Sequence, residues 1–254
     1  MTQRLTLALV AFVIWTLITV LGGHVLNPSA SDLQSLVISG LNWTFVIAAA
    51  FVIGIALWQG WNDIGLNRPA TARDILLAWL PALYIVAGFT AAIIFGLPPV
   101  TVLFWVLLNT FFVGLSEEVM FRGVLLQAFR HNLPIWPAVL LTSVMFGSVH
   151  TLNVFLTGDL TTAVIQSTAA FLSGLMFIAL RLRTGTLWVP IIVHGLWDFA
   201  TFVLGISVSG QSAEANVSPG GLAAFVPVLL VLPNALYGLW LMRNISKTHA
   251  NPQD

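Results

Sequence analysis

Six ionisable residues lie inside long apolar stretches of this 254-residue sequence, where a charge is costly. They are two neighbouring glutamates, an arginine, two histidines and an aspartate: Glu117, Glu118, Arg122, His150, His194 and Asp198. A charged side chain at the centre of a membrane helix costs about 2.5–3.5 kcal/mol on insertion scales. Carboxylates and imidazoles are also the groups that exchange protons in general acid–base catalysis. The six residues are therefore candidates for a buried functional site.

The spacing of these residues predicts which of them share a helix face. Glu118 and Arg122 are four residues apart, in the order that pairs well on a helix, so a structural ion pair would explain both. It would leave Glu117 and the histidines unexplained. His194 and Asp198 are also four apart, so the carboxyl group could orient or polarise the imidazole.

His150 has two neighbours at helical spacing. Phe146 precedes it by four residues and is expected to pack beside it, and Asn153 follows by three and falls near the same face. A single buried histidine is usually a packing residue. Two histidines level with a pair of glutamates favour a functional site instead.

The elements that carry these residues are predicted to be membrane helices. Only 7% of the residues are charged and 58% are hydrophobic, whereas a soluble domain has about 25% charged residues. We expect one all-α integral membrane domain over residues 1–254, a bundle of about eight spans of ~20 residues each. The apolar runs are Leu5–Leu21, Leu36–Trp58, Ile75–Leu97, Val100–Phe129, Pro134–Leu156, Leu160–Leu180, Thr186–Ile206 and Leu222–Met242.

The charges between the runs predict the orientation of the bundle. Alternate connections collect all the loop arginines and lysines: Arg4, Arg68, Arg73, Arg130, Arg181, Arg183, Arg243 and Lys247. The opposite connections hold Asp32, Asp159 and Glu214 and neither lysine nor arginine. Because positive loops stay in the cytoplasm, both termini are predicted to be cytoplasmic. The first run could alternatively be a cleaved signal peptide within residues 1–30.

Composition also excludes several kinds of site. The sequence has no cysteine, which excludes disulfides, Cys-ligated zinc and thiol nucleophiles. The formal net charge is zero, which argues against a nucleic-acid partner.

Helix geometry predicts that the ionisable residues meet at one depth. At 1.5 Å per residue, Glu117 lies about 20 Å from the cytoplasmic end of its span. His150, His194 and Asp198 lie about 25, 15 and 20 Å from the cytoplasmic ends of theirs. These helices therefore place their polar groups within about 10 Å of one level near the middle of the membrane. We expect a shared cavity.

The same residues form three motifs in order. Glu117 to Arg122 reads EExxxR, Phe146 to His150 reads FxxxH, and His194 to Asp198 reads Hxxx(N/D). On successive helices of an eight-span protein, they resemble the CPBP family of intramembrane proteases. This family includes the CAAX prenyl endopeptidases and bacterial bacteriocin-processing or immunity (ABI) proteins. The resemblance covers about residues 100–205, the expected catalytic core.

The resemblance implies hydrolysis of a peptide bond within the membrane. Glu117 would be the general base that activates water, and His150 would help to hold that water. His194 and Asp198 would stabilise the oxyanion, with Glu118 and Arg122 shaping and balancing the site. Many relatives have Asn at the last position, and its amide can donate a hydrogen bond to the oxyanion. An ionised Asp can only accept, so Asp198 would have to be protonated or would orient His194 instead.

A metal-dependent alternative uses the same groups. Glu117, His150 and His194 could supply a His₂Glu zinc set, although the H-E-x-x-H spacing is absent. We favour a site without metal or other cofactor.

Two other classes of function remain open. Buried Glu, His and Asp also mark proton relays, as in a proton-coupled transporter, although no internal repeat indicates one. A non-catalytic immunity or scaffold protein could keep the same residues. For an enzyme, the expected partners are the lipid bilayer and a peptide or membrane-anchored protein substrate. The expected location is a bacterial plasma membrane.

Overall fold

The chain folds as a bundle of helices. The computed structural model describes residues 2–26, 28, 32–68, 71–210 and 224–248, and every regular element among them is helical. The prediction of an all-α membrane protein is confirmed. Six helical segments of this described part are long and apolar enough to cross a membrane, and two shorter apolar helices accompany them. The eight begin with α1 (Gln3–Leu26), α3 (Trp43–Trp58), α5 (Trp79–Phe95) and α6 (Val100–Glu118), and continue with α8 (Ile135–His150), α10 (Leu160–Thr184), α11 (Trp188–Ser209) and α12 (Val226–Met242).

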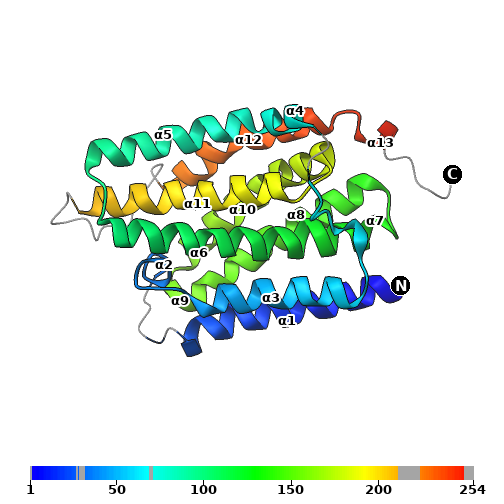
Figure 1. Cartoon of the computed structure of the whole chain (residues 1–254), viewed down its shortest axis with the longest axis horizontal. Coiled ribbons are helices and arrows are strands. Elements are labelled where there is room, and N and C mark those ends of the chain that lie inside the picture. Colours follow the sequence, from blue (N-terminus) through cyan, green and yellow to red (C-terminus); the bar gives the residue numbers. More distant parts are fainter. Residues whose placement is uncertain (1, 27, 29–31, 69–70, 211–223, 249–254) are drawn as a thin grey trace.

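The long helices run roughly parallel to one another and alternate in direction (Figure 1). The start of α1 and the short helix α13 (Ile245–Thr248) lie at the same end. We call it the basic end, because the connections that hold Arg68, Arg130 and Arg243 are there. The opposite end, where the connections hold Asp32 and Asp159, is the acidic end. Glu214 and Leu222 lie outside the described residues, as does the side chain of Lys247.

The second predicted span is not one helix. Its first residues form the short helix α2 (Ser35–Ile38), and the chain then breaks before α3. Gly40 has φ +150°, a conformation that favours glycine, and the Asn42 side chain caps α3 by accepting from the backbone N–H of Thr44. The buried Asn109 of α6 donates to the carbonyls of Val37 and Gly40. Polar contacts thus hold α2 against the bundle.

The fourth predicted span continues without interruption but changes its helix type. After α6 comes a π-helical segment, η3 (Val119–Leu125), followed by α7 (Leu126–Arg130). The Gln127 side chain donates to the carbonyl of Arg122 within this segment. Short π-helical segments inside α-helices are rare, and those that occur are often found at functional sites. Here the segment follows directly after the two glutamates.

The fifth predicted span agrees with a candidate span over Ile135–Thr157, but it is not one α-helix. Its α-helix ends at His150, and a 3₁₀ turn, η4 (Thr151–Asn153), leads into α9 (Val154–Thr157). The sixth span extends to Thr184, so that Arg181 and Arg183 lie in the last turn of α10 rather than in a loop. Basic side chains are stabilised there by the negative end of the helix dipole.

Candidate active site

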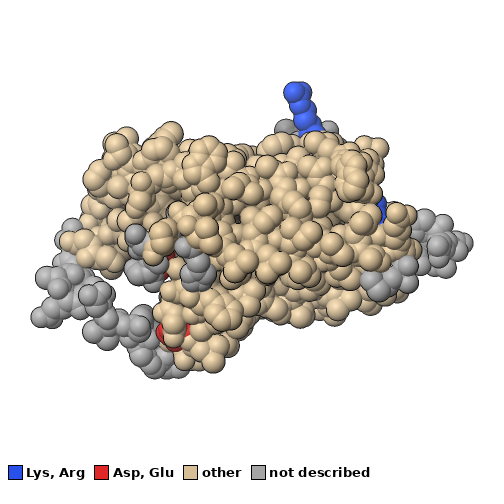
Figure 2. All heavy atoms as spheres, turned by 90° about the horizontal axis from the view of Figure 1, so that it is seen from below, with Lys and Arg blue, Asp and Glu red and all other residues tan. Residues whose placement is uncertain are grey.

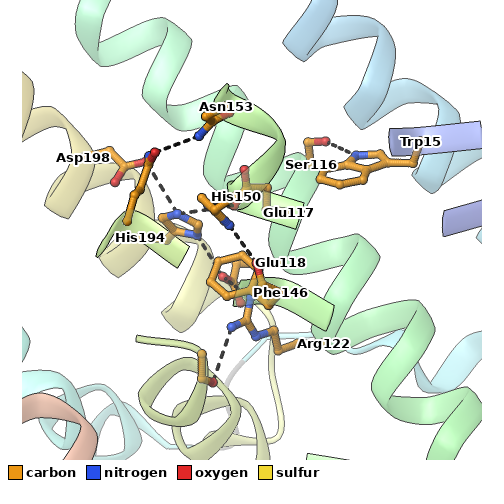
Figure 3. A network of polar contacts seen from close by, with 12 residues as sticks. Trp15, Ser116, Glu117, Glu118, Arg122, Phe146, His150, Asn153, His194 and Asp198 are labelled. Atoms are coloured by element: carbon orange, nitrogen blue, oxygen red, sulfur yellow. Dashed lines mark hydrogen bonds and ion pairs between the residues drawn. The ribbon is translucent and has the colours of Figure 1, made fainter. Parts of the chain in front are cut away.

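A cavity of about 220 Å³ reaches the predicted site from the acidic end of the bundle. Its polar floor contains Glu117, His150, His194 and Asp198, and Asn153 lies on its wall. Three helices supply the floor, since α6 carries the glutamate, α8 carries the first histidine, and α11 carries the second histidine and the aspartate. The structure thus brings these side chains into one cavity (Figure 3).

Glu117 faces both imidazoles. Its Oε2 atom lies 3.7 Å from Nε2 of His194 and 3.9 Å from Nε2 of His150. The same oxygen is buried and has no hydrogen-bond partner among the described residues. Buried polar atoms are nearly always satisfied, so an unpaired carboxylate oxygen needs an explanation such as a catalytic role. The separations leave Oε2 free to bind a group that all three side chains face.

Glu118 fixes the orientation of His194. Its Oε1 atom lies 2.8 Å from Nδ1 of His194 and accepts a hydrogen bond from Arg122 at 3.0 Å. Because the carboxylate accepts, the proton on Nδ1 is directed to Glu118 and Nε2 faces the cavity. Glu118 and Arg122 are fully buried. The predicted ion pair is present, and its carboxylate also holds the histidine.

His150 is oriented by its own helix. Its Nδ1 atom lies 2.7 Å from the carbonyl oxygen of Phe146, which can only accept. Nδ1 is therefore the donor, and Nε2 faces Glu117, with a lone pair available when the ring is neutral. The Phe146 ring also contacts the imidazole edge-to-face, with the ring centroids 4.9 Å apart. Phe146 packs beside His150 as the spacing predicts.

The base of the site is closed by aromatic rings and Arg122. The guanidinium carbon of Arg122 lies 4.1 Å from the centroid of the Phe146 ring and 5.2 Å from that of Phe177. Phe177 stacks on His194 with the centroids 4.7 Å apart. Cation–π contacts of this kind stabilise a desolvated arginine. Arg122 also donates to the carbonyl of Gly174.

A contact between two glycines sets the distance between α6 and α11. A Cβ atom added at Gly114 would lie 2.9 Å from the carbonyl oxygen of Ile191, and one at Gly195 would lie 3.1 Å from that of Thr110. Small residues allow such close approach of helix backbones. Gly114 is one turn before Glu118 and Gly195 directly follows His194, so this contact brings the two side chains within hydrogen-bonding distance.

Asp198 contacts His194 as the four-residue spacing predicts, whereas Asn153 has a partner that the spacing did not predict. Asp198 Oδ2 lies 3.5 Å from Nε2 of His194, on the ring atom that faces the cavity rather than the one that Glu118 holds. Asn153 donates to the side chain of Gln166 on α10 instead of contacting His150. Asp198 thus belongs to the cavity floor, while Asn153 belongs to its wall.

Trp15 is a site neighbour that the sequence did not reveal. The residue is buried on α1 and lines the cavity, and its indole N–H donates to the Ser116 hydroxyl at 2.7 Å. Ser116 directly precedes Glu117. The only signal in the sequence is a tryptophan in the middle of an apolar run, which is not enough to link α1 with α6.

The arrangement suits acid–base chemistry on a bound water or carbonyl group. The Oε2 atom of Glu117 has no hydrogen-bond partner among the described residues. The Nδ1 atoms of His150 and His194 are each held by a hydrogen bond, so that both Nε2 atoms face the cavity. Among the described residues, no three His, Cys, Asp or Glu side chains converge closely enough to hold a metal ion. Neither the zinc alternative nor the metal-free prediction is decided by this geometry.

Comparison with known proteins finds a similarity in the middle part of the chain. Residues 99–200 match the family model described as type II CAAX prenyl endopeptidase Rce1-like. No curated protein and no solved structure matches the chain. The matched segment runs from the start of α6 into α11 and includes all three motifs.

Proposed function

We propose that this integral membrane protein, whose residues 99–200 match the type II CAAX prenyl endopeptidase Rce1-like family model, is an intramembrane endopeptidase with Glu117 as general base. One observation carries the proposal. Glu117 Oε2 is buried without a hydrogen-bond partner among the described residues, at the floor of a cavity, and faces Nε2 of both histidines. A water bound there lies within reach of a base and of an imidazole acceptor.

The reaction balances with these groups alone. Glu117 accepts a proton from the water, whose oxygen attacks the carbonyl carbon of the scissile peptide bond. The C–N bond then breaks, and Glu117 returns the proton to the leaving amine. His150 Nε2 accepts a hydrogen bond from the water and so helps to hold it.

His194 is proposed to stabilise the negative charge on the carbonyl oxygen. Glu118 holds its Nδ1 atom, so Nε2 points into the cavity and, when protonated, donates to the oxyanion. Asp198 contacts the same nitrogen at 3.5 Å. We propose that Asp198 orients the imidazole or, when protonated, adds a second donor. Glu118 and Arg122 are positioning residues, since they act on the site through His194.

We propose that no metal takes part. The two histidines and Glu117 have complete roles in the proposed reaction without one. Elemental analysis of the purified protein, with cleavage assayed before and after chelation, tests this point. Stoichiometric zinc whose removal abolishes cleavage would overturn it.

The function is tested by comparing membranes that contain the wild-type protein with membranes that contain Glu117→Gln. Proteomic mapping of polypeptide termini is expected to find termini that appear only with the wild type. Gln has nearly the same shape as Glu but cannot act as a base, and both proteins are expected to accumulate equally. Identical termini in both samples would contradict the proposal.

A further inference from the structure

The cavity extends from the site in one direction only. Beyond its floor, its walls come from the second half of α1, from α2, from the start of α3 and from η4 and α9. Figure 1 shows α2 and α9 together at the acidic end. The rim includes Leu33 and the largely exposed Phe155. The cavity therefore connects Glu117 with the acidic end of the bundle.

The opposite direction is closed. Between the site and the basic end lie Glu118, Phe121, Arg122 and Phe146, whose side chains are at most 1% exposed. Their rings and the guanidinium are in contact with one another, since the centroids of Phe121 and Phe146 are 4.9 Å apart. Protein interiors of this kind are close-packed and leave no path for a polypeptide. Glu117 is therefore closed off from the basic end.

The distribution of charge predicts which end of the bundle is cytoplasmic. The sequence has nine lysines and arginines, and all except Arg122 belong to the basic end. The segments that join helices at the acidic end contain none of them. Figure 2 likewise shows blue side chains in the right half of the molecule and red ones towards the left. By the positive-inside rule, the basic end is cytoplasmic and the cavity opens on the other side.

The walls of the cavity indicate which polypeptide fits. Above the polar floor they are mostly apolar and aromatic, with Trp15, Val20, Leu36, Phe45 and Leu156 among them, and the polar side chains Thr19, Asn153 and Gln166 are uncharged. No lysine or arginine lines the described cavity. A carboxylate or phosphate would lose its hydration there without gaining a counter-charge, whereas apolar side chains would gain from burial.

We propose that the scissile segment reaches Glu117 from the non-cytoplasmic side of the membrane. The substrate is a membrane-anchored polypeptide whose cleavage site lies at that side, with uncharged, apolar side chains next to the cleaved bond. This inference rests on the proposed endopeptidase function for its substrate, but the access route rests on the cavity and the charges alone.

The absence of cysteine allows a direct test, because each introduced thiol is unique. Leu33→Cys places a thiol at the rim of the cavity, and Arg68→Cys places one at the exposed basic end as the matched control. Both variants are treated with a membrane-impermeant sulfonated thiol reagent in right-side-out and in inverted membrane vesicles. Phe155→Cys repeats the measurement at the same rim if Leu33→Cys does not accumulate.

Labelling of the rim cysteine in right-side-out vesicles, and of Arg68→Cys only in inverted ones, is the expected result. The reverse pattern would overturn the proposal, as would a rim cysteine that reacts in detergent but from neither side of the membrane.

A second experiment tests whether blocking the cavity from outside also blocks cleavage. Labelling Leu36→Cys from outside is expected to abolish the cleavage seen with the same unlabelled variant, and continued cleavage would overturn the route. If wild-type membranes show no cleavage at all, the endopeptidase function fails while the labelling result stands.

Discussion

Nδ1 of His194 lies 2.8 Å from Oε1 of Glu118, the same oxygen that accepts from Arg122 at 3.0 Å. One buried carboxylate oxygen thus joins α11 to the ion pair of the fourth span. The neighbouring carboxylate, Glu117, instead lines the cavity, where its Oε2 atom lies 3.7 Å from Nε2 of His194 and 3.9 Å from Nε2 of His150. Adjacent glutamates therefore have different surroundings, and we propose a structural role for Glu118 and a chemical role for Glu117.

This difference predicts that Glu118→Gln destabilises the fold. Gln leaves the fully buried Arg122 without a counter-charge, which costs about 3–5 kcal/mol when a buried pair loses one partner. Thermal unfolding in detergent should show a large decrease for Glu118→Gln and a small change for Glu117→Gln. The double variant Glu118→Gln/Arg122→Met should recover part of the loss, because no charge is then left unpaired. Equal stability of the two single variants would contradict the assignment.

The glycine contact between α6 and α11 predicts a second effect. Gly114→Ala places a methyl group 2.9 Å from the carbonyl oxygen of Ile191, so the helices must separate. Overpacking of this kind costs about 1–3 kcal/mol, and cleavage should fall because Glu118 and His194 move apart. Gly54→Ala is the control, since nothing lies within 4 Å of its added Cβ. Unfolding temperature and cleavage rate are measured for both, and equal effects would argue against the contact.

The hydrogen bond between Trp15 and Ser116 predicts coupling between α1 and α6. Trp15→Phe removes the donor and Ser116→Ala removes the acceptor, each at a cost of about 0.5–1.5 kcal/mol. The two losses should not add in the double variant, because they remove the same bond. A double-mutant cycle on unfolding free energies measures this coupling. Fully additive losses would mean that the bond contributes nothing.

At the basic end, Asp63 predicts a dependence of stability on pH. Burial of its carboxyl raises its pKa, but hydrogen bonds from Arg4 and His131 and the charge of Arg4 outweigh burial, so the pKa is lower than the ordinary 3.8. A lowered pKa means that the folded state favours the ionised form. This stability is present above the unfolded pKa, at about pH 4, and is lost as the pH falls through the folded pKa.

Asp63→Asn removes this contribution. The variant should unfold at a lower temperature than the wild type at pH 7, and the two should converge as the pH falls below about 4. Unfolding temperatures across this range provide the measurement. A difference that does not change with pH would contradict a role for the ionised carboxylate.

The composition and the apolar runs predicted the fold class, and helical spacing predicted the contacts that are local to one helix. Glu118 and Arg122 pair as their four-residue interval predicts, because that contact is local to one helix. The bond from Glu118 to His194 was not predicted, because it depends on how closely α6 and α11 approach. That distance is set by Gly114 and Gly195, and glycines in membrane helices are too common to identify one such contact.

The apolar runs could not reveal breaks between helices. α2 and α3 form one hydrophobic stretch in the sequence, since a short helix that lines a cavity has the same composition as a span. Asn109 was the available signal, because a buried amide in an apolar run needs partners. Its partners are the backbone of Val37, Gly40 and Asn42, which lie about 70 residues earlier in the chain. Only tertiary packing reveals them.

The most direct test of the account is the cleavage rate of purified protein in liposomes, with wild type and Glu117→Gln assayed on a polypeptide identified from the membrane comparison. The account predicts that Glu117→Gln loses at least about 100-fold in rate, the lower end of what a general base contributes, while its unfolding temperature stays close to that of the wild type. Cleavage at the wild-type rate by a correctly folded Glu117→Gln protein would contradict the account.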